Sequence, residues 1–409
     1  MPTGMREDFP SRPALRRIRR DGRERRLSNR PIYLDYNATT PHAPEVVAAM
    51  RPYLEEHFGN PSSSHWYGRK TREAVETARS QVAAQLNCTP AEVLFTSGGT
   101  ESNNHAIRGI ALERRDHGKH IITSQIEHPA VTGVCERLKQ DGFEITYLPV
   151  DGHGMVSAGD VERAIRPETI LITLMHANNE VGTIQPIEEV AELAKARGIV
   201  FHTDAAQSAG KIPTDVRALG VDLLSVAGHK LYAPKGVGAL YVREGISLER
   251  FMEGAGQEGG RRPGTENVLE VVGLGKACEI AHRDLAANSE HMRRMRNRLE
   301  AGLLERVASL GVNGHPDNRL PNTLSASVEG VDAGAVLAAI EDKVAASAGA
   351  ACHSGRVHVS HVLLAMRIPE QRARGTLRFS TGRMTSEEDI DAAVAAVADA
   401  AERLRARRS

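Results

Sequence analysis

The sequence predicts an α/β fold with a mostly parallel, seven-stranded sheet in a large domain and a smaller α+β domain after it. Length is the first reason, because 409 residues are too many for one small core. Second, short apolar runs alternate with amphipathic stretches from residue 91 to residue 242, which is the pattern of βαβ units. Third, polar segments follow several of these runs, which places them at the carboxyl edge of the sheet, where α/β proteins bind ligands.

Each element of the large domain is expected from its own pattern. Amphipathic helical patterns begin near Glu101, Pro129, Asp160 and Ile187, and they separate the apolar runs. Helices should therefore cover both faces of the sheet. The expected strands span residues 92–96, 120–124, 144–149, 170–175, 200–203, 223–226 and 238–242.

The last third of the chain has a mixed pattern. A long helical stretch spans 267–309 and is expected to break or kink near Asn288 and Ser289. Beyond it, the sequence predicts a loop around Cys352 and a terminal helix from Ser386. The other expected elements are strands at 322–328, 344–347 and 376–380 and helices at 333–340 and 360–366.

The first 30 residues differ from the rest of the chain. Arginine dominates residues 16–26 without apolar periodicity, so residues 1–30 are expected to be a disordered tail. The alternative is that the start codon is assigned too early, at Met1. The segment lacks the apolar core of a secretory signal and is too acidic for a transit peptide. A role in binding nucleic acid or a partner is the alternative. The remaining chain should form a large domain over 44–286 and a small domain from 31–43 with 287–409.

Charge and hydropathy limit the possible functions. Acidic and basic residues are balanced at 52 each, so no global field favours nucleic acid or an anionic membrane. No run of about 18 apolar residues is free of charge, which argues against a transmembrane helix. We therefore expect a cytoplasmic enzyme that acts on a small molecule.

The cysteines have neither CxxC pairs nor metal-ligand spacing, so we expect reduced thiols and no metal site. They are Cys88, Cys135, Cys278 and Cys352. The first three are expected to be small buried hydrophobes. Cys352 lies in the small-residue run 347–355, where a nearby His353 or Arg356 would favour a reactive thiolate. From these residues alone, a reactive thiol and a small residue in a turn are equally good interpretations.

A lysine and an aspartate follow two neighbouring expected strands. Lys230 comes after Gly228 and His229, beyond the strand at 223–226, and Asp204 follows the strand at 200–203. A lysine amine can hold an aldehyde cofactor as a Schiff base, and a buried aspartate can pair with a protonated pyridine nitrogen. The combination points to pyridoxal 5'-phosphate (PLP). The alternative for Asp204 is a simple helix N-cap.

Further polar residues follow other expected strands. Residues 97–103 can bring backbone N–H groups and the Thr100 hydroxyl to a phosphate, or can form a capped turn. His128 can stack on a flat ring and move protons, or can be a hydrogen-bonded loop residue. Asn178 can donate to a phenolic ring oxygen or mark a turn. Gln207 reaches the same ring substituents if a helix begins just before it.

Taken together, these segments resemble one known family. The matching segments are 33–41, 59–63, 97–103, 178–180, 202–207, 228–230, 256–258, 262–265 and 378–380. Their order and content, from about residue 31 to the end, are similar to the cysteine desulfurase and selenocysteine lyase family. These are class V aminotransferase-like enzymes of PLP fold type I, so the resemblance implies that fold and that cofactor.

The resemblance also implies roles for the residues that match the family's motifs. Lys230 would be the Schiff-base lysine, Asp204 the partner of the pyridine nitrogen, and His128 the acid/base residue stacked on the ring. Asn178 and Gln207 would contact the ring oxygen.

The phosphate and the substrate have their own residues in this resemblance. Thr100 and His229 would bind the phosphate, and Thr265 would reach the phosphate of the neighbouring subunit, which implies a homodimer. Arg378, with Asn178 beside it, would bind the substrate carboxylate through its planar guanidinium. Cys352 would be the nucleophile that takes the substrate's sulfur as a persulfide.

Three positions depart from the family pattern. Ala227 stands where a serine often contributes a phosphate hydrogen bond, and Ala255 interrupts a glycine-rich segment. Val359 precedes Ser360 where a proline is usual. None of these changes removes a catalytic group, but the first two are expected to weaken cofactor binding.

The implied activity is that of a PLP-dependent cysteine desulfurase, which converts L-cysteine to L-alanine and passes persulfide sulfur to an acceptor protein in iron–sulfur cluster assembly or tRNA thiolation. A selenocysteine lyase acting on L-selenocysteine is the nearest rival activity, because segments 35–40, 262–267 and 349–354 look closer to that branch. Two further interpretations are a non-catalytic scaffold in a sulfur-transfer assembly and an aminotransferase of the same fold.

Overall fold

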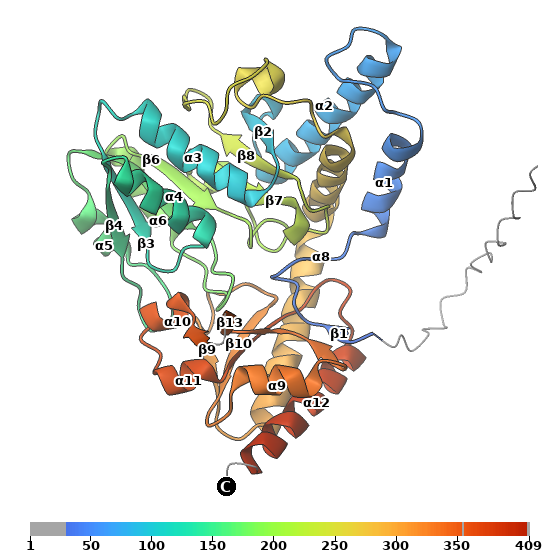
Figure 1. The fold of residues 1–409 in the computed structure, drawn as a ribbon, viewed down its shortest axis with the longest axis vertical. Coiled ribbons are helices and arrows are strands. Elements are labelled where there is room, and N and C mark those ends of the chain that lie inside the picture. Colours follow the sequence, from blue (N-terminus) through green and yellow to red (C-terminus); the bar gives the residue numbers. More distant parts are fainter. Residues whose placement is uncertain (1–29, 354–355, 407–409) are drawn as a thin grey trace, which may run out of the picture. The chain divides into compact units, whose positions relative to one another are not determined.

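The main sheet has seven strands in the order β2-β8-β7-β6-β5-β3-β4 (Figure 1). Strand β8 runs antiparallel to both of its neighbours, and the other pairs are parallel, so the predicted mostly parallel sheet is confirmed. The strands are β2 (Val93–Thr96), β3 (His120–Ser124), β4 (Glu144–Leu148), β5 (Thr169–Met175), β6 (Val200–Asp204), β7 (Leu223–Ala227) and β8 (Gly238–Val242).

The computed structural model describes residues 30–353 and 356–406. The tail predicted over residues 1–30 lies outside these ranges except for Arg30. The described residues from Pro31 onward form one compact unit, and the predicted boundaries of a large and a small domain within it stay a prediction.

Helices pack on both faces of the main sheet, because side chains on successive strand residues point to opposite faces. On one face, Leu94 shares a buried cluster with Ile107 of α3 and Val131 of α4. On the other face, its neighbour Val93 shares a second cluster with Leu274 of the long helix α8 (Val268–Arg306). The helices before α8 are α1 (Pro44–Glu55), α2 (Trp66–Leu86), α3 (Gly99–Glu113), α4 (Pro129–Gln140), α5 (Ala158–Ala164), α6 (Ile187–Ala196) and α7 (Val216–Leu219).

A second, antiparallel sheet has the strand order β12-β15-β10-β9. It packs with α9 (Ala333–Ile340) and α12 (Glu387–Ala406) around its own buried cluster. A short strand near the N-terminus, β1 (Ile32–Tyr33), pairs in parallel with β11 (Val344–Ala345), which brings the following residues beside this sheet. The four strands of this antiparallel sheet are β9 (Leu310–Asn313), β10 (Thr323–Val328), β12 (Ser347–Ala348) and β15 (Thr376–Ser380).

The long helix α8 is continuous over Val268–Arg306, so the break predicted near Asn288 and Ser289 is wrong. Asparagine and serine lower helix propensity only weakly, and tertiary packing overrides that preference. Contacts with α1 and α2 stabilise one part of α8 and contacts with α12 another, as Figure 1 shows.

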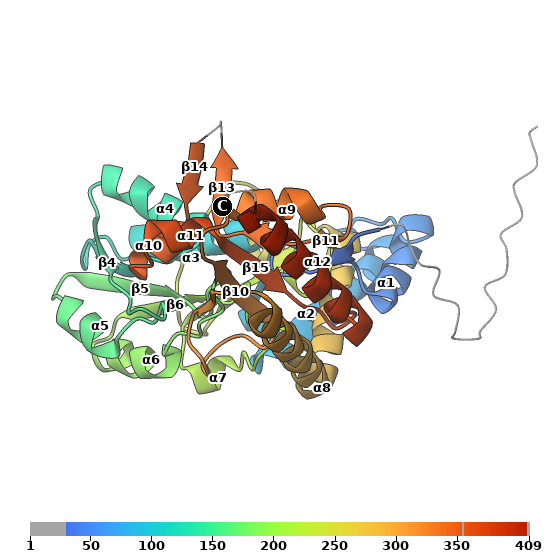
Figure 2. The ribbon, with the colours of Figure 1, turned by 90° about the horizontal axis from the view of Figure 1, so that it is seen from below.

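The segment around Cys352 is a β-hairpin, where the sequence predicted a loop. Strand β13 (Ala350–His353) pairs with β14 (Arg356–Val359), and Cys352 lies opposite Val357. The antiparallel partner satisfies backbone groups that an isolated Gly/Ala-rich segment would leave to water. Figure 2 shows the two strands as a hairpin beside α10 (His361–Ala365) and α11 (Glu370–Arg374). The Cys352 side chain lies outside the part of the chain that is described.

The packing of α8 leads to a stability prediction. Leu299 is fully buried, at 0% exposure, in the cluster beneath the second sheet. Leu299→Ala should therefore lower the free energy of unfolding by about 3 kcal/mol in urea titrations. Leu304 is 50% exposed on the same helix, and Leu304→Ala should stay within about 0.5 kcal/mol of the original protein. Equal losses for the two variants would contradict this packing.

Among the described residues, no helix is both long and apolar enough to span a bilayer. In the same part of the chain, no group of three or more His, Cys, Asp or Glu side chains is placed to hold a metal ion.

Candidate active site

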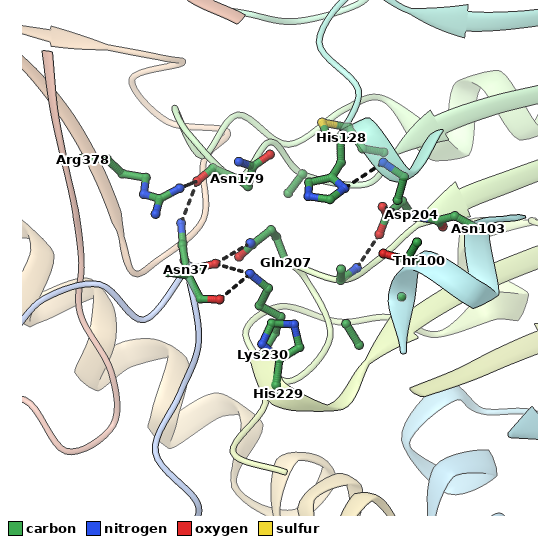
Figure 3. A pocket seen from close by; sticks show the side chains of 17 residues that line it. Asn37, Thr100, Asn103, His128, Asn179, Asp204, Gln207, His229, Lys230 and Arg378 are labelled. Atoms are coloured by element: carbon green, nitrogen blue, oxygen red, sulfur yellow. Dashed lines mark hydrogen bonds between the residues drawn. The ribbon is translucent and has the colours of Figure 1, made fainter. Parts of the chain in front are cut away.

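Most of the residues predicted to form a site line one cavity, which has a volume of about 290 Å³ (Figure 3). Met175, Asp204 and Ala227, the last residues of β5, β6 and β7, all lie in its wall. The carboxyl ends of these parallel strands meet at one edge, so residues far apart in sequence come together there. The predicted residues in the wall are Thr100, His128, Asp204, Gln207, His229, Lys230 and Arg378.

Lys230 lies on the short 3-10 turn Gly228–Lys230 that follows β7. Its Nζ donates to the carbonyl oxygens of Asn37 and Ala38, the second at 2.8 Å. Burial, and then the charge of Arg378, lower the pKa of Lys230 to about 8. A larger fraction of this amine is therefore neutral near neutral pH than in an ordinary lysine, and the neutral form attacks an aldehyde.

Asp204 ends β6 and is 6% exposed. Its Oδ2 accepts from Asn103 Nδ2 at 2.6 Å, and its Oδ1 accepts from the backbone N–H of Ala206 at 2.9 Å. Both partners are neutral, and a buried carboxylate is costly unless a cation compensates it. A turn follows Asp204, so the alternative of a helix N-cap is wrong.

Helix α3 begins at the edge of the cavity without a side-chain cap. Its N-cap residue is Gly98, whose φ of 145° favours glycine. Gly99 and Thr100 line the cavity, and the first N–H groups of a helix have no partner within the helix. A Cβ on Gly99 would lie 3.1 Å from the Ala227 methyl, so small residues leave space at the N-terminus of α3. The arrangement suits a phosphate.

Two histidines complete the wall. His128 is the N-cap of α4, and its Nδ1 accepts from the Ala130 N–H at 3.1 Å. The proton of the neutral ring therefore sits on Nε2. Burial lowers the pKa of His128, and burial followed by the charge of Lys230 lowers the pKa of His229 to about 4. Both imidazoles are accordingly neutral hydrogen-bonding groups near neutral pH.

Asn37 and Lys211 link neighbouring parts of the cavity wall through hydrogen bonds, and no sequence pattern indicated this role. Lys211 is buried, at 4% exposure, and its Nζ donates to Asn37 Oδ1 at 3.1 Å and to Gln207 Oε1 at 2.9 Å. Gln207 Nε2 in turn donates to the Asn37 carbonyl at 3.0 Å. Because lysine can only donate, it fixes the orientation of both amides. Asn37 lies in segment 33–41, one of the segments that resemble the family, so this resemblance could have identified it.

The two neighbouring asparagines differ in placement. Asn178 is fully buried, and its Oδ1 accepts from the N–H groups of Glu180 and Val181 at 2.8 and 3.0 Å. Its Nδ2 donates to Ile126 O at 3.2 Å, away from the cavity wall, where Asn179 lies instead (Figure 3). Of the two, only Asn179 lines the cavity, and the ring-oxygen and substrate contacts expected of Asn178 stay a prediction.

Thr265 does not line this cavity. It is exposed and lies in a separate depression with Arg262. Arg262 Nε donates to Glu101 Oε1 at 2.9 Å, which ties the 262–265 segment to α3. The placement leaves Thr265 available to another molecule.

Arg378 enters the cavity from β15 of the second sheet. Its Nη2 forms an ion pair with Asp35 Oδ1 at 2.8 Å. Its Nη1 donates to Asn179 O at 3.3 Å (Figure 3). The site thus combines the ends of the main sheet with residues from the N-terminal segment and the second sheet.

These features define a class: an enzyme whose lysine would bind a phosphorylated aldehyde at the carboxyl edge of an α/β sheet. Comparison with known proteins agrees, because the family model for aminotransferase class-V matches residues 32–393. This chain belongs to the aminotransferase class-V family.

Two relatives illustrate the similarity. The cysteine desulfurase IscS of Methanosarcina thermophila is 47% identical over 386 residues, which cover 94% of this chain and 95% of the relative. The cysteine desulfurase IscS of Dictyoglomus turgidum is 47% identical over 363 residues, covering 88% and 92%.

Solved structures agree with the fold. A NifS-like protein has a TM-score of 0.86 at 35% identity, covering 92% of this chain and all of its own (100%). The structure of SspA in complex with cysteine has a TM-score of 0.76 at 40% identity, covering 87% and 99%.

The low pKa of Lys230 leads to a pH prediction. The rate at which the apoprotein captures added PLP should rise with pH and be half-maximal near pH 8, because the charged amine below this pH does not attack the aldehyde. An ordinary lysine would give a midpoint near pH 10.4. Visible absorbance after rapid mixing measures the rate, and a midpoint above about pH 10 would contradict the buried position of the amine.

Proposed function

We propose that this protein is a PLP-dependent cysteine desulfurase that converts L-cysteine to L-alanine and leaves a persulfide on Cys352. The observation that carries the proposal is the single cavity shared by Lys230, Asp204 and Arg378, in a chain that is 47% identical to a cysteine desulfurase over 94% of its length. The cavity offers an amine for an aldehyde, a carboxylate for a ring nitrogen and a guanidinium for an amino-acid carboxylate.

PLP fits the residues present. Lys230 would bind its aldehyde carbon, Asp204 would supply the anion for the ring nitrogen, and the N-terminus of α3 with Thr100 and His229 would bind the phosphate. Asp204 has only neutral hydrogen-bond partners, which do not compensate the negative charge of its carboxylate. A protonated ring nitrogen would compensate this charge. When bound, PLP withdraws electrons from the Cα of the amino acid attached to it.

The chain's own residues would carry out the remaining steps. Arg378 binds the substrate carboxylate, and the Lys230 amine, with a pKa of about 8, takes the proton from Cα. The thiolate of Cys352 then attacks the substrate sulfur, so an S–S bond forms while the Cβ–S bond breaks. The electron pair released to the carbon side is later protonated to give the methyl group of alanine. His128 lines the same cavity with its proton on Nε2, and it would transfer protons there.

The proposal includes a homodimer. Thr265 is exposed, lies outside the Lys230 cavity, and is held near α3 by the Arg262–Glu101 ion pair. In a dimer, Thr265 would reach the cofactor phosphate of the neighbouring subunit. A cytoplasmic location and a sulfur-acceptor protein, which would take the sulfur from Cys352, complete the proposal.

The test is to incubate the purified protein with L-cysteine, and separately with L-selenocysteine, to measure alanine, and to map the modified thiol by mass spectrometry. We expect alanine from L-cysteine and a persulfide on Cys352. Alanine from L-selenocysteine alone would indicate a selenocysteine lyase. Transfer of the amino group to a keto acid without a persulfide would indicate an aminotransferase, and a protein that stays colourless with added PLP would indicate a scaffold.

A further inference from the structure

Two internal acceptors hold the guanidinium of Arg378 in the cavity wall. Its Nη2 donates to Asp35 Oδ1 at 2.8 Å and to Ser347 Oγ at 3.0 Å. Ser347 Oγ also donates to Asp35 Oδ1 at 3.0 Å, so the three side chains form a closed triangle. The ion pair is largely buried, since the Arg378 and Asp35 side chains are 13% and 18% exposed.

Both internal contacts are made by one nitrogen. Nη2 carries two N–H groups and donates to Asp35 and to Ser347, whose acceptor atoms lie side by side. Nη1 donates at a longer distance to Asn179 O, and Nε has no partner among the described residues. A carboxylate binds a guanidinium bidentately either through Nη1 and Nη2 or through Nε and Nη2. Because both arrangements need Nη2, a substrate carboxylate competes with the internal acceptors for this nitrogen.

Asp35 is the stronger of the two internal acceptors because a charged acceptor binds a guanidinium more tightly than a hydroxyl does. We propose that Asp35 is a positioning residue that competes with the substrate: it holds the Arg378 guanidinium in place and is exchanged for the carboxylate of an incoming amino acid. The proposal rests on the carboxylate-binding role given to Arg378 above.

The backbone around Asp35 supports an exchange that moves only its side chain. Its carbonyl accepts from the Ala38 N–H at 2.9 Å and from the Tyr33 hydroxyl at 3.0 Å, and Asp35 forms a β-bridge with Ser380. The backbone is therefore held on both sides, whereas the carboxylate is partly exposed and can rotate away. Only a ligand with its own carboxylate restores the charge pairing of Arg378, so the exchange would select amino acids over simple amines.

The test uses two ligands that differ only in the carboxylate. L-alanine carries it and ethylamine lacks it, and each is titrated into the PLP-loaded enzyme while visible absorbance is followed. Asp35→Asn keeps the shape and an acceptor for Nη2 but removes the charge. It should lower the Kd for L-alanine about tenfold and leave the Kd for ethylamine within about twofold. The KM for L-cysteine should fall in parallel while kcat does not rise.

The matched control is Ser347→Ala, which removes the neutral acceptor from the same nitrogen and should change the Kd for L-alanine by less than about twofold. If Asp35→Asn does not fold, Asp35→Ser removes the same charge and serves in its place. Unchanged or weaker binding of L-alanine, or equal tightening of both ligands, would overturn the proposal.

The same titrations separate this inference from the proposed function, because L-alanine binding needs no sulfur chemistry. A selective gain for L-alanine without alanine formation from L-cysteine or L-selenocysteine would overturn the desulfurase and support the role of Asp35. Alanine formation from L-cysteine without the selective gain for L-alanine would support the desulfurase and overturn the role of Asp35.

Discussion

Lys230→Ala is expected to give a folded protein that stays colourless with added PLP and loses at least about 10³-fold of its activity on L-cysteine. The variant lacks both the amine that would hold the cofactor and the base that would take the Cα proton, and a positioned base alone contributes about 10²–10⁴-fold. The buried Lys211 cannot replace it, because its Nζ is held by Asn37 and Gln207 and does not line the cavity.

Stability should not fall with this change. Burial lowers the pKa of Lys230 to about 8, so folding disfavours the charged amine at every pH below its ordinary pKa, and the cost is complete below about pH 8. Removal of the amine relieves this cost at neutral pH. Lys235→Ala is the control, because Lys235 is an exposed lysine in the same segment, and it should keep the colour and the activity. Thermal unfolding, visible absorbance and alanine release measure the three expectations. A coloured, active Lys230→Ala protein would refute the assignment.

Cys352→Ala is expected to keep the cofactor colour and to lose persulfide formation, with alanine release from L-cysteine below about 1% of the original rate. The remaining thiols cannot substitute. Burial raises the pKa of Cys88, Cys135 and Cys278 to about 12, so very little reactive thiolate is present at neutral pH.

Cys88→Ala provides the control, because Cys88 is only half-buried and is the most accessible of these three thiols. It should retain full activity and the persulfide on Cys352, as mapped by mass spectrometry. Undiminished sulfide release from Cys352→Ala in the presence of a thiol reductant would contradict the nucleophilic role of Cys352.

Local patterns predicted the architecture because the spacing of apolar residues along the chain indicates whether a strand or a helix can bury them on one face. The expected strands at 120–124, 238–242 and 376–380 match β3, β8 and β15 in full, and the helix at 333–340 matches α9. In each case apolar periodicity extends over the whole element and polar or turn residues follow it. The same reasoning failed at Asn288 and Ser289, where neighbouring helices stabilise α8 against a weak local preference.

The site required information that no local pattern contains. Which of the two asparagines lines the cavity depends on a turn in which Asn178 Oδ1 accepts two backbone N–H groups, while Asn179 lies in the cavity wall. Lys211 has the sequence appearance of a surface lysine, yet hydrogen bonds to Asn37 and Gln207 hold it in the interior.

By itself, the sequence determined the α/β architecture, the order of the polar segments along it, and hence the available chemistry: an amine, a carboxylate, a guanidinium and a thiol. Only the tertiary structure decided which of these groups meet, and it placed Asp35 on Arg378 and the Asn37 carbonyl on Lys230. The physical reason is that each of these contacts joins segments far apart in the chain, through hydrogen bonds and charge pairing that leave no periodic trace in the sequence.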